Sequence, residues 1–193
     1  MRYPAAETAE KHTRILETAA ALFRKKGFAG VSVGELMRAS GLTHGPFYNH
    51  FASKEALMSE SFEHASLASL AAIEAAGESP RALLAHFDDY LSATHRDAPE
   101  QGCLFACLAT EVGREESVRP SLTRYLRTAI GHLSKPWGKL TRKAARREAI
   151  QTVSAMVGAM VLARAVDDPE FSDEILTSVR ETLRKSVAAA AST

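Results

Sequence analysis

The chain has few cysteines, almost no net charge and no long apolar run. Its 193 residues include two cysteines, Cys103 and Cys107, too few and too close together for a disulfide framework. We find no signal peptide and no apolar stretch long enough to span a bilayer, so we expect a cytoplasmic protein. The formal net charge is +1, so no strong overall field marks a nucleic-acid or membrane binder.

The sequence also lacks the short motifs of common enzyme classes. There is no phosphate-binding glycine loop, no G-x-S-x-G turn and no H-E-x-x-H motif. His64, His86 and Glu111 could meet in a pocket, but ligand contact or a surface position explains them better. The two cysteines lie four residues apart with no third ligand nearby in the sequence. We therefore predict no enzyme, no metal site and no cofactor.

The segment 31–54 organises the rest of the chain. Ser32 can cap a helix, and Glu35 follows three residues later as its capping-box partner. Apolar residues then continue on one helical face, and Gly41 stands where a left-handed residue would end the helix. These signals predict a short helix followed by a tight turn.

A second short helix is predicted from Thr43 to Asn49, with Thr43 as its cap and Pro46 in its first turn. Phe47 and Phe51 are four residues apart and would pack inward. A helix of about two turns is not stable alone in water, so its polar and aromatic outer face needs another explanation. The residues expected on that outer face are Thr43, His44, Tyr48 and His50.

Binding in the major groove of DNA would explain the polar and aromatic side chains on the outer face of this helix. A helix-turn-helix places the start of its second helix against base edges, while neighbouring residues hold phosphates. The predicted DNA contacts are Ser32, Thr43, His44, Gly45, Tyr48, His50 and Lys54. Residues 1–60 hold eight Lys and Arg against six Asp and Glu, a difference of only +2, so the footprint is local and its salt dependence moderate.

The segment GLTHGPFYNHFASKEAL resembles the recognition-helix segment of TetR-type transcriptional regulators. It departs from the family pattern at His44 and Pro46, and residues 15–33 are also similar to the family's opening segment. The positions that match the pattern are Gly45, Phe47, Tyr48, His50, Phe51 and Lys54.

The resemblance implies an all-α fold of about nine helices. Residues 1–52 would form a three-helix DNA-binding domain after a loose polar arm, and residues 53–193 a helical effector-binding and dimerisation domain. The implied function is that of a repressor released from a palindromic operator by a small-molecule effector.

Two long helices are predicted at the end of the chain, over residues 141–165 and 172–190. Their apolar faces are wide, and a terminal helix pair can cover such faces by meeting its own copy about a two-fold axis. Since these helices are also similar to TetR-type dimerisation helices, we expect a homodimer. The alternative is that the two faces only complete an internal core.

The middle helices are the expected effector-binding region. They can leave an apolar pocket for a small apolar or amphipathic ligand, although core packing is the more ordinary role for each residue singly. The resemblance favours a pocket, and solid packing would instead favour an architectural DNA binder without a ligand. The candidate lining residues are Phe62, Phe87, Tyr90, Phe105, Leu108, Leu126, Trp137, Met156 and Met160.

Two further features allow alternative interpretations. Cys103 follows Gly102 at a predicted helix start, where the helix dipole favours a thiolate. The segment QGCLFACLATE resembles one in TetR-type regulators, some of which sense electrophiles or oxidants through a cysteine there; otherwise Cys103, like Cys107, is a small core residue. The basic run 135–147 is a solvated loop and helix start, or else a second surface for nucleic acid or an acidic partner.

Overall fold

The structure is a computed structural model that describes residues 5–192. Over this range it contains ten α-helices, two short 3-10 helices and no strand, which confirms the all-α prediction. The sequence predicts a loose polar arm before a helix that starts at about Thr8, but the helix already begins at Ala5, and residues 1–4 of the arm lie outside the described residues. The helices are α1 (Ala5–Lys26), α2 (Val33–Ala39), α3 (Phe47–His50), α4 (Lys54–Ala76), α5 (Pro80–Tyr90), α6 (Ala93–Asp97), η1 (Pro99–Gln101), α7 (Leu104–Val112), α8 (Arg119–Leu133), η2 (Lys135–Trp137), α9 (Arg142–Ala165) and α10 (Pro169–Ser192).

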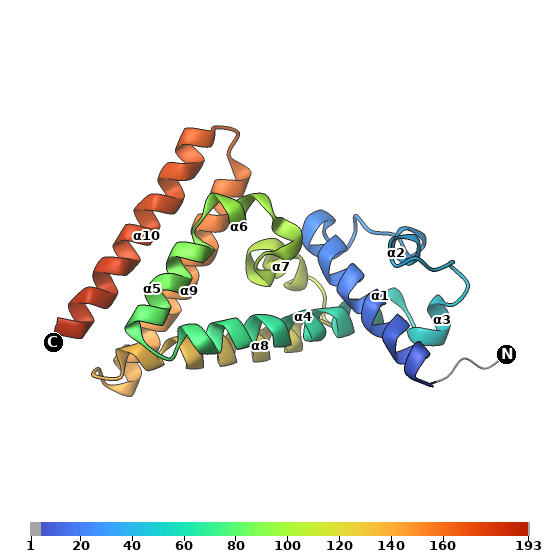
Figure 1. The fold of residues 1–193 in the computed structure, drawn as a ribbon, viewed down its shortest axis with the longest axis horizontal. Helices are drawn as coiled ribbons and strands as arrows, with labels where there is room; N and C mark the ends of the chain where they lie inside the picture. Colours follow the sequence, from blue (N-terminus) through green and yellow to red (C-terminus); the bar gives the residue numbers. More distant parts are fainter. Residues whose placement is uncertain (1–4, 193) are drawn as a thin grey trace.

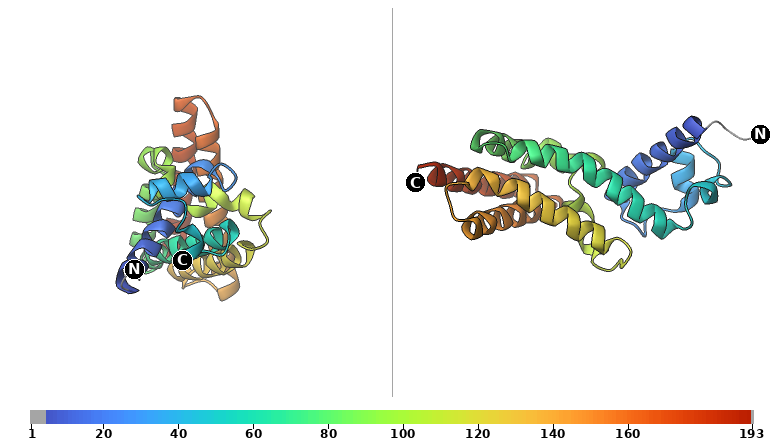
Figure 2. Two further views of the ribbon diagram at one scale, coloured as in Figure 1. Left: turned by 90° about the vertical axis from the view of Figure 1, so that its right-hand side faces the viewer. Right: turned by 90° about the horizontal axis from the view of Figure 1, so that it is seen from below.

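The molecule is elongated, with α1 to α3 at one end and α10 at the other (Figure 1). We call α1 to α3 the head and the remaining helices the body. Helix α4 leaves the head and runs into the body with α8 packed along it (Figure 2). The predicted domain boundary at residue 52 falls between α3 and α4 and stays a prediction.

Side-chain caps begin several helices where the sequence predicts them. The hydroxyl of Ser53 accepts a hydrogen bond from the Ala56 amide at 3.2 Å, and α4 runs from Lys54 to Ala76 as expected. Ser79 caps α5 and Thr141 caps α9 in the same way. Each cap satisfies an amide that the first helical turn leaves without a partner.

The structure differs from the prediction at two further helix boundaries. Ser79, Pro80 and the apolar spacing after them predict one helix from Ser79 to about residue 97, but the helix ends at Tyr90, because Ser92 caps a separate helix, α6. Helix α10 begins at Pro169 rather than at residue 172, because an Asp168 carboxylate oxygen accepts from the amides of Glu170 (3.0 Å) and Phe171 (3.1 Å). The extra break brings the α-helices to ten instead of about nine.

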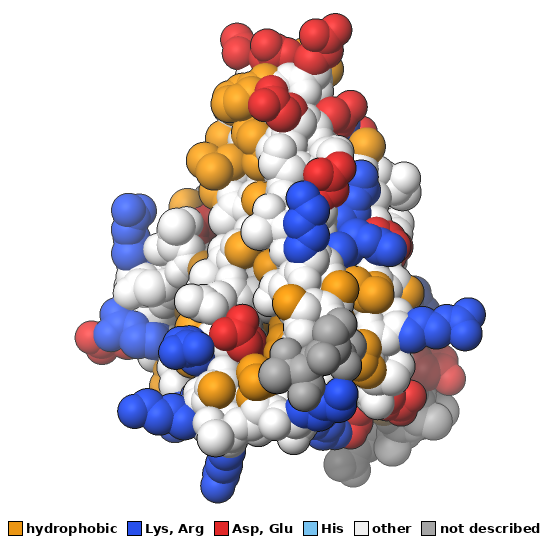
Figure 3. Space-filling view, turned by 90° about the vertical axis from the view of Figure 1, so that its left-hand side faces the viewer, with side chains coloured by type: hydrophobic (Ala, Val, Ile, Leu, Met, Phe, Trp, Pro, Cys, Tyr) orange, Lys and Arg blue, Asp and Glu red, His pale blue; other side chains and the backbone are white. Residues whose placement is uncertain are grey.

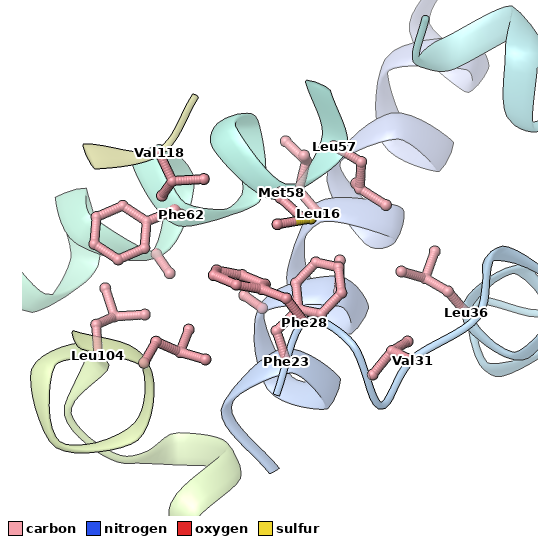
Figure 4. Close-up of a cluster of buried hydrophobic side chains, with 14 of the residues drawn as sticks. Leu16, Phe23, Phe28, Val31, Leu36, Leu57, Met58, Phe62, Leu104 and Val118 are labelled. Atoms are coloured by element: carbon pink, nitrogen blue, oxygen red, sulfur yellow. The ribbon is translucent and has the colours of Figure 1, made fainter. Parts of the chain in front are cut away.

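Two clusters of buried apolar side chains hold the chain together. One joins the head to the start of α4 and to α7, where Phe23 and Phe28 pack near Met58 and Leu104 (Figure 4). The other fills the space among α5, α8, α9 and α10. Since the first cluster draws on both head and body, the head packs directly against body helices rather than hanging from a linker.

Candidate nucleic-acid interface and ligand cavity

Helix α2 begins and ends with the local bonds that the sequence predicts. The Ser32 hydroxyl accepts from the Glu35 amide at 3.2 Å. The Glu35 carboxylate accepts from the Lys26 ammonium at 2.5 Å, which is the main cause that lowers the pKa of Glu35. At the other end, Gly41 has φ +73°, and the Leu42 amide donates to the Met37 carbonyl at 2.9 Å. The turn after α2 is therefore a glycine-dependent helix stop, as predicted.

Helix α3 is shorter than predicted. It spans Phe47–His50 and is preceded by Pro46 with no side-chain cap, whereas the sequence predicts a helix from Thr43 to Asn49 capped by Thr43. A capping hydroxyl bonds an amide two or three residues on, and Pro46 has no N–H to offer Thr43 at the latter position. Thr43, His44 and Gly45 instead form an irregular turn before the helix.

The outer surface of this unit holds most of the predicted DNA contacts. Phe47 and Phe51 are buried as expected, whereas the Tyr48 side chain is 67% exposed. His50 is only half-buried, with its ring centroid 5.7 Å from that of His12, and burial is the first cause that lowers its pKa. The exposed members of the predicted set are Ser32, Thr43, His44, Gly45 and Tyr48.

Lys54 is engaged within the protein. Its ammonium donates to the Phe28 carbonyl at 2.6 Å, while the Phe28 amide donates to the Glu111 carboxylate at 2.7 Å. The backbone of one residue in the α1–α2 loop, Phe28, is thus held by α4 through its carbonyl and by α7 through its amide. The role of Lys54 as a phosphate contact stays a prediction. The contact of Glu111 with the head joins residues 83 apart and has no local signal in the sequence.

The body contains two adjoining cavities of about 180 and about 30 Å³. Both are bounded by Ile73 from α4, by His86 and Tyr90 from α5, by Cys103 just before α7 and by Tyr125 from α8. The larger cavity is also lined by Ser69, Ala72, Asp89, His95, Gln101 and Gly102. The smaller is also lined by Phe105, Ala129, Leu133, Val153, Met156 and Val157. The larger cavity is therefore mixed in polarity, and the smaller one is mostly apolar.

Only part of the predicted lining reaches these cavities. Tyr90, Phe105 and Met156 line them, and so does Cys103. The predicted residues that line neither cavity are Phe62, Phe87, Leu108, Leu126, Trp137 and Met160, which pack in the two apolar clusters instead. Of the three polar residues considered for a shared pocket, His86 lines the cavities, whereas His64 and Glu111 do not.

His95 fixes the polar wall of the larger cavity. Its Nδ1 lies 2.7 Å from the Tyr90 carbonyl, and its Nε2 accepts from the Cys103 amide at 3.1 Å. Since Nε2 accepts, Nδ1 must carry the ring proton and donate to Tyr90. Burial is the first cause that lowers the pKa of His95, so the ring is neutral near pH 7. No local signal in the sequence marks His95 or Tyr125 as cavity residues, because only the folding of distant helices brings them together.

The two cysteines occupy different surroundings. Cys103 takes the N-cap position of α7 and is half-buried at the cavity wall. The Cys107 sulfur lies 3.2 Å from an Arg164 guanidinium nitrogen, and burial is the first cause that raises the pKa of its thiol. Arg164 also donates to the His95 carbonyl at 2.7 Å, so Cys107 is part of a polar contact behind the cavity.

Within residues 5–192 no helix is long and apolar enough to cross a membrane. The same part of the chain holds no group of three or more His, Cys, Asp or Glu side chains placed to bind a metal ion. The basic side chains of segment 135–147 are exposed, as expected of a solvated run.

Residues 15–61 match the family model of bacterial regulatory proteins of the tetR family. This segment of the chain belongs to the TetR family. The match covers α2, the turn and α3, the segment whose geometry is described above. Its fold agrees with that of reduced NemR from E. coli, with a TM-score of 0.76 and 22% identity over 91% of this chain and 97% of that one.

The curated relatives that the chain matches are transcription regulators. The uncharacterised HTH-type regulator YerO of Bacillus subtilis is 38% identical over 98 residues, 46% of this chain and 33% of YerO. The repressor DhaR of Mycobacterium sp. strain GP1 is 26% identical over 133 residues, 67% of this chain and 62% of DhaR. The chain thus covers less than two thirds of either relative. The matched segment agrees with the predicted class of DNA-binding regulator.

Proposed function

We propose that this protein is a homodimeric transcriptional repressor of the TetR family that binds a palindromic DNA operator and leaves it when a small molecule enters the body cavity. The observation that supports it most is the exposed start of α3, where Thr43, His44, Gly45 and Tyr48 face solvent beyond the buried Phe47. Such a surface at the end of a helix-turn-helix fits the major groove. A bacterial protein with this function works in the cytoplasm.

The apolar outer face of α9 supports the dimer. Ile150, Ser154, Gly158 and Leu162 recur every four residues, and a Cβ added at Gly158 would meet no atom within 4 Å. Leu162 is 56% exposed. Figure 3 shows hydrophobic side chains gathered on this end of the molecule, below an acidic tip. A second copy would bury this face and set two heads on one DNA duplex.

Helix α7 offers a route from cavity to head. Cys103 at its N-cap lines the cavity, while Glu111 near its other end holds the Phe28 amide. The head is also tied to the segment before α7, because the Arg24 guanidinium donates to the Glu100 carbonyl at 2.8 Å. A ligand that binds one position of α7 more tightly than another would favour the matching position of the head. The difference in affinity between the two conformations sets how far this equilibrium shifts. The presence of a cavity also favours this function over an architectural role without a ligand.

Selection of binding sites from fragmented DNA of the source genome tests the proposal. The purified full chain should enrich a site with two inverted half-sites about one helical turn, or a multiple of it, apart. Footprinting on that site should protect both half-sites. Enrichment of no sequence, or of an asymmetric single site, would contradict the proposal.

A second candidate is a thiol-based response, because Cys103 lines both cavities. In this scheme the Cys103 sulfur adds to an electrophilic carbon of the ligand, and the thiol proton ends on the neighbouring carbon. N-ethylmaleimide is a suitable probe. Loss of operator binding in wild type and in Cys107→Ser, but not in Cys103→Ser, would support the thiol response. Equal behaviour of all three would leave a reversible ligand as the effector.

A further inference from the structure

One buried polar group at the cavity has only a weak partner. The Tyr90 side chain is 8% exposed and lines both cavities, yet among the described residues its hydroxyl has no nitrogen or oxygen partner and meets only the Cys103 thiol. This contact helps, after burial, to raise the pKa of Tyr90, but a thiol is a weak hydrogen-bonding group. Leaving a buried hydroxyl unsatisfied is costly, so this site is prepared to bond another molecule.

The position of this hydroxyl sets it apart from the other buried polar atoms without a partner. These are Nδ1 of His132 and Nε1 of Trp137, and neither residue lines the two cavities. The neighbouring Tyr125 does line them, but its hydroxyl bonds with Ser69 and its ring stacks on Phe105 at 4.6 Å. Of these groups, only the Tyr90 hydroxyl is buried, has no partner stronger than a thiol and reaches a cavity.

The charge of the lining selects against ions. Neither cavity is lined by Lys or Arg, and the one carboxylate, Asp89, has an exposed side chain. The two histidines of the wall, His86 and His95, have pKa values lowered first by burial, so they are uncharged near pH 7. An anionic ligand would lose its hydration and meet no cation in the wall, because the Arg164 guanidinium behind it already donates to the Arg96 and His95 carbonyls.

The cavity size bounds the ligand. A cavity of about 150 Å³ takes up benzene, and the larger cavity here has about 180 Å³ with a further apolar space of about 30 Å³ beside it. A one-ring or compact two-ring compound fits this space. The apolar wall formed by Phe105, Val153 and Met156 suits its hydrocarbon part.

We propose that the cavity takes an uncharged one-ring or compact two-ring compound with an acceptor oxygen, and that the Tyr90 hydroxyl donates a hydrogen bond to that oxygen. This inference rests on the proposed function only in treating the cavity as the effector site. Tyr90 then determines which ligands are preferred, whereas Tyr125 only forms part of the cavity wall.

Three probes of equal heavy-atom count test this inference: acetophenone with an acceptor oxygen, cumene without one, and benzoate with a charge. Affinities are measured by amide chemical-shift titration of the full chain as wild type, Tyr90→Phe and Tyr125→Phe. We expect wild type to bind acetophenone about 2- to 10-fold more tightly than cumene, the range for one hydrogen bond, and benzoate not at all. Tyr90→Phe should abolish the preference, and Tyr125→Phe should keep it.

Several results would overturn the inference: equal affinity of wild type for acetophenone and cumene, a preference that survives in Tyr90→Phe, tightest binding of benzoate, or no binding of any probe. Operator binding is measured on the same preparations without a probe. A wild type that binds its operator but fails the probe test refutes the inference alone, whereas a wild type that binds no operator refutes the proposed function.

Discussion

The backbone of Phe28 shows how single residues connect the head to the body. Its amide donates to Glu111 from α7, and its carbonyl accepts from Lys54 of α4. Both contacts join residues that are distant in the chain, and both end on the same loop. The position of this loop therefore depends on two body helices at once.

Removing the Glu111 carboxylate should destabilise the protein. Glu111→Ala leaves the Phe28 amide without its acceptor, which costs about 1–3 kcal/mol in the free energy of unfolding. Glu111→Gln keeps an acceptor oxygen and should cost less. Urea denaturation of both variants measures the difference, and equal stability of Glu111→Ala and wild type would show that this bond contributes nothing.

Buried histidines should make stability depend on pH. His50, His86 and His95 all have pKa values lowered first by burial. Below about pH 6.5 the unfolded chain binds more protons than the folded one, so the free energy of unfolding falls as pH decreases from 7 to 5. Urea denaturation at several pH values should show this slope, and it should be smaller in His86→Asn. A flat profile would contradict the burial of these rings.

At the scale of helices and turns, Gly27 and Gly41 provide a matched pair. Their φ angles are +74° and +73°, but a Cβ at Gly27 would lie 2.4 Å from a Glu111 oxygen, whereas at Gly41 it would meet nothing within 4 Å. Gly41→Ala should cost about 1–2 kcal/mol for the left-handed backbone alone, and Gly27→Ala should cost more. Thermal or urea unfolding measures both variants.

A double variant tests whether the Glu111 carboxylate causes the extra cost of Gly27→Ala. In Gly27→Ala combined with Glu111→Ala, the added methyl group no longer meets the carboxylate. The combined loss should then be smaller than the sum of the two single losses. Additive losses would show that the Gly27 contact with Glu111 plays no part.

Helix ends were predictable from the sequence where a single local bond decides them. Ser53 and Ser79 cap the helices that follow, as predicted, and Thr141 caps the helix whose start is predicted there. The predicted start of the second short helix was wrong because Pro46 lacks the amide that Thr43 needs. The predicted end of the helix after Ser79 was wrong because Ser92 caps a separate helix.

The ligand cavity was less predictable, because its wall combines residues of several helices. Apolar spacing finds Tyr90, Phe105 and Met156 but cannot tell whether an inward side chain meets a cavity or another side chain. Phe87 and Met160 show the same spacing and are fully buried in packed core. His95 reaches the wall through bonds to Tyr90 and Cys103 that only the folded chain creates.

At the scale of the whole molecule, the apolar face of α9 predicts a dimer that one charge should break. Leu162→Glu places a carboxylate in the proposed interface and should give a monomer near 20.9 kDa by sedimentation equilibrium. Leu67→Glu is the matched control, because Leu67 is 70% exposed on α4, away from α9. A dimeric Leu162→Glu variant would place the interface elsewhere.

The affinity of Tyr48→Ala for the selected operator shows whether the exposed start of α3 binds operator DNA. Fluorescence anisotropy gives the affinity, and sedimentation confirms that the variant remains dimeric. Loss of a phosphate or base contact in each of two heads should weaken binding by at least about 10-fold, at about 1 kcal/mol or more per contact. An unchanged affinity in a folded, dimeric Tyr48→Ala variant would contradict the proposed DNA-binding surface.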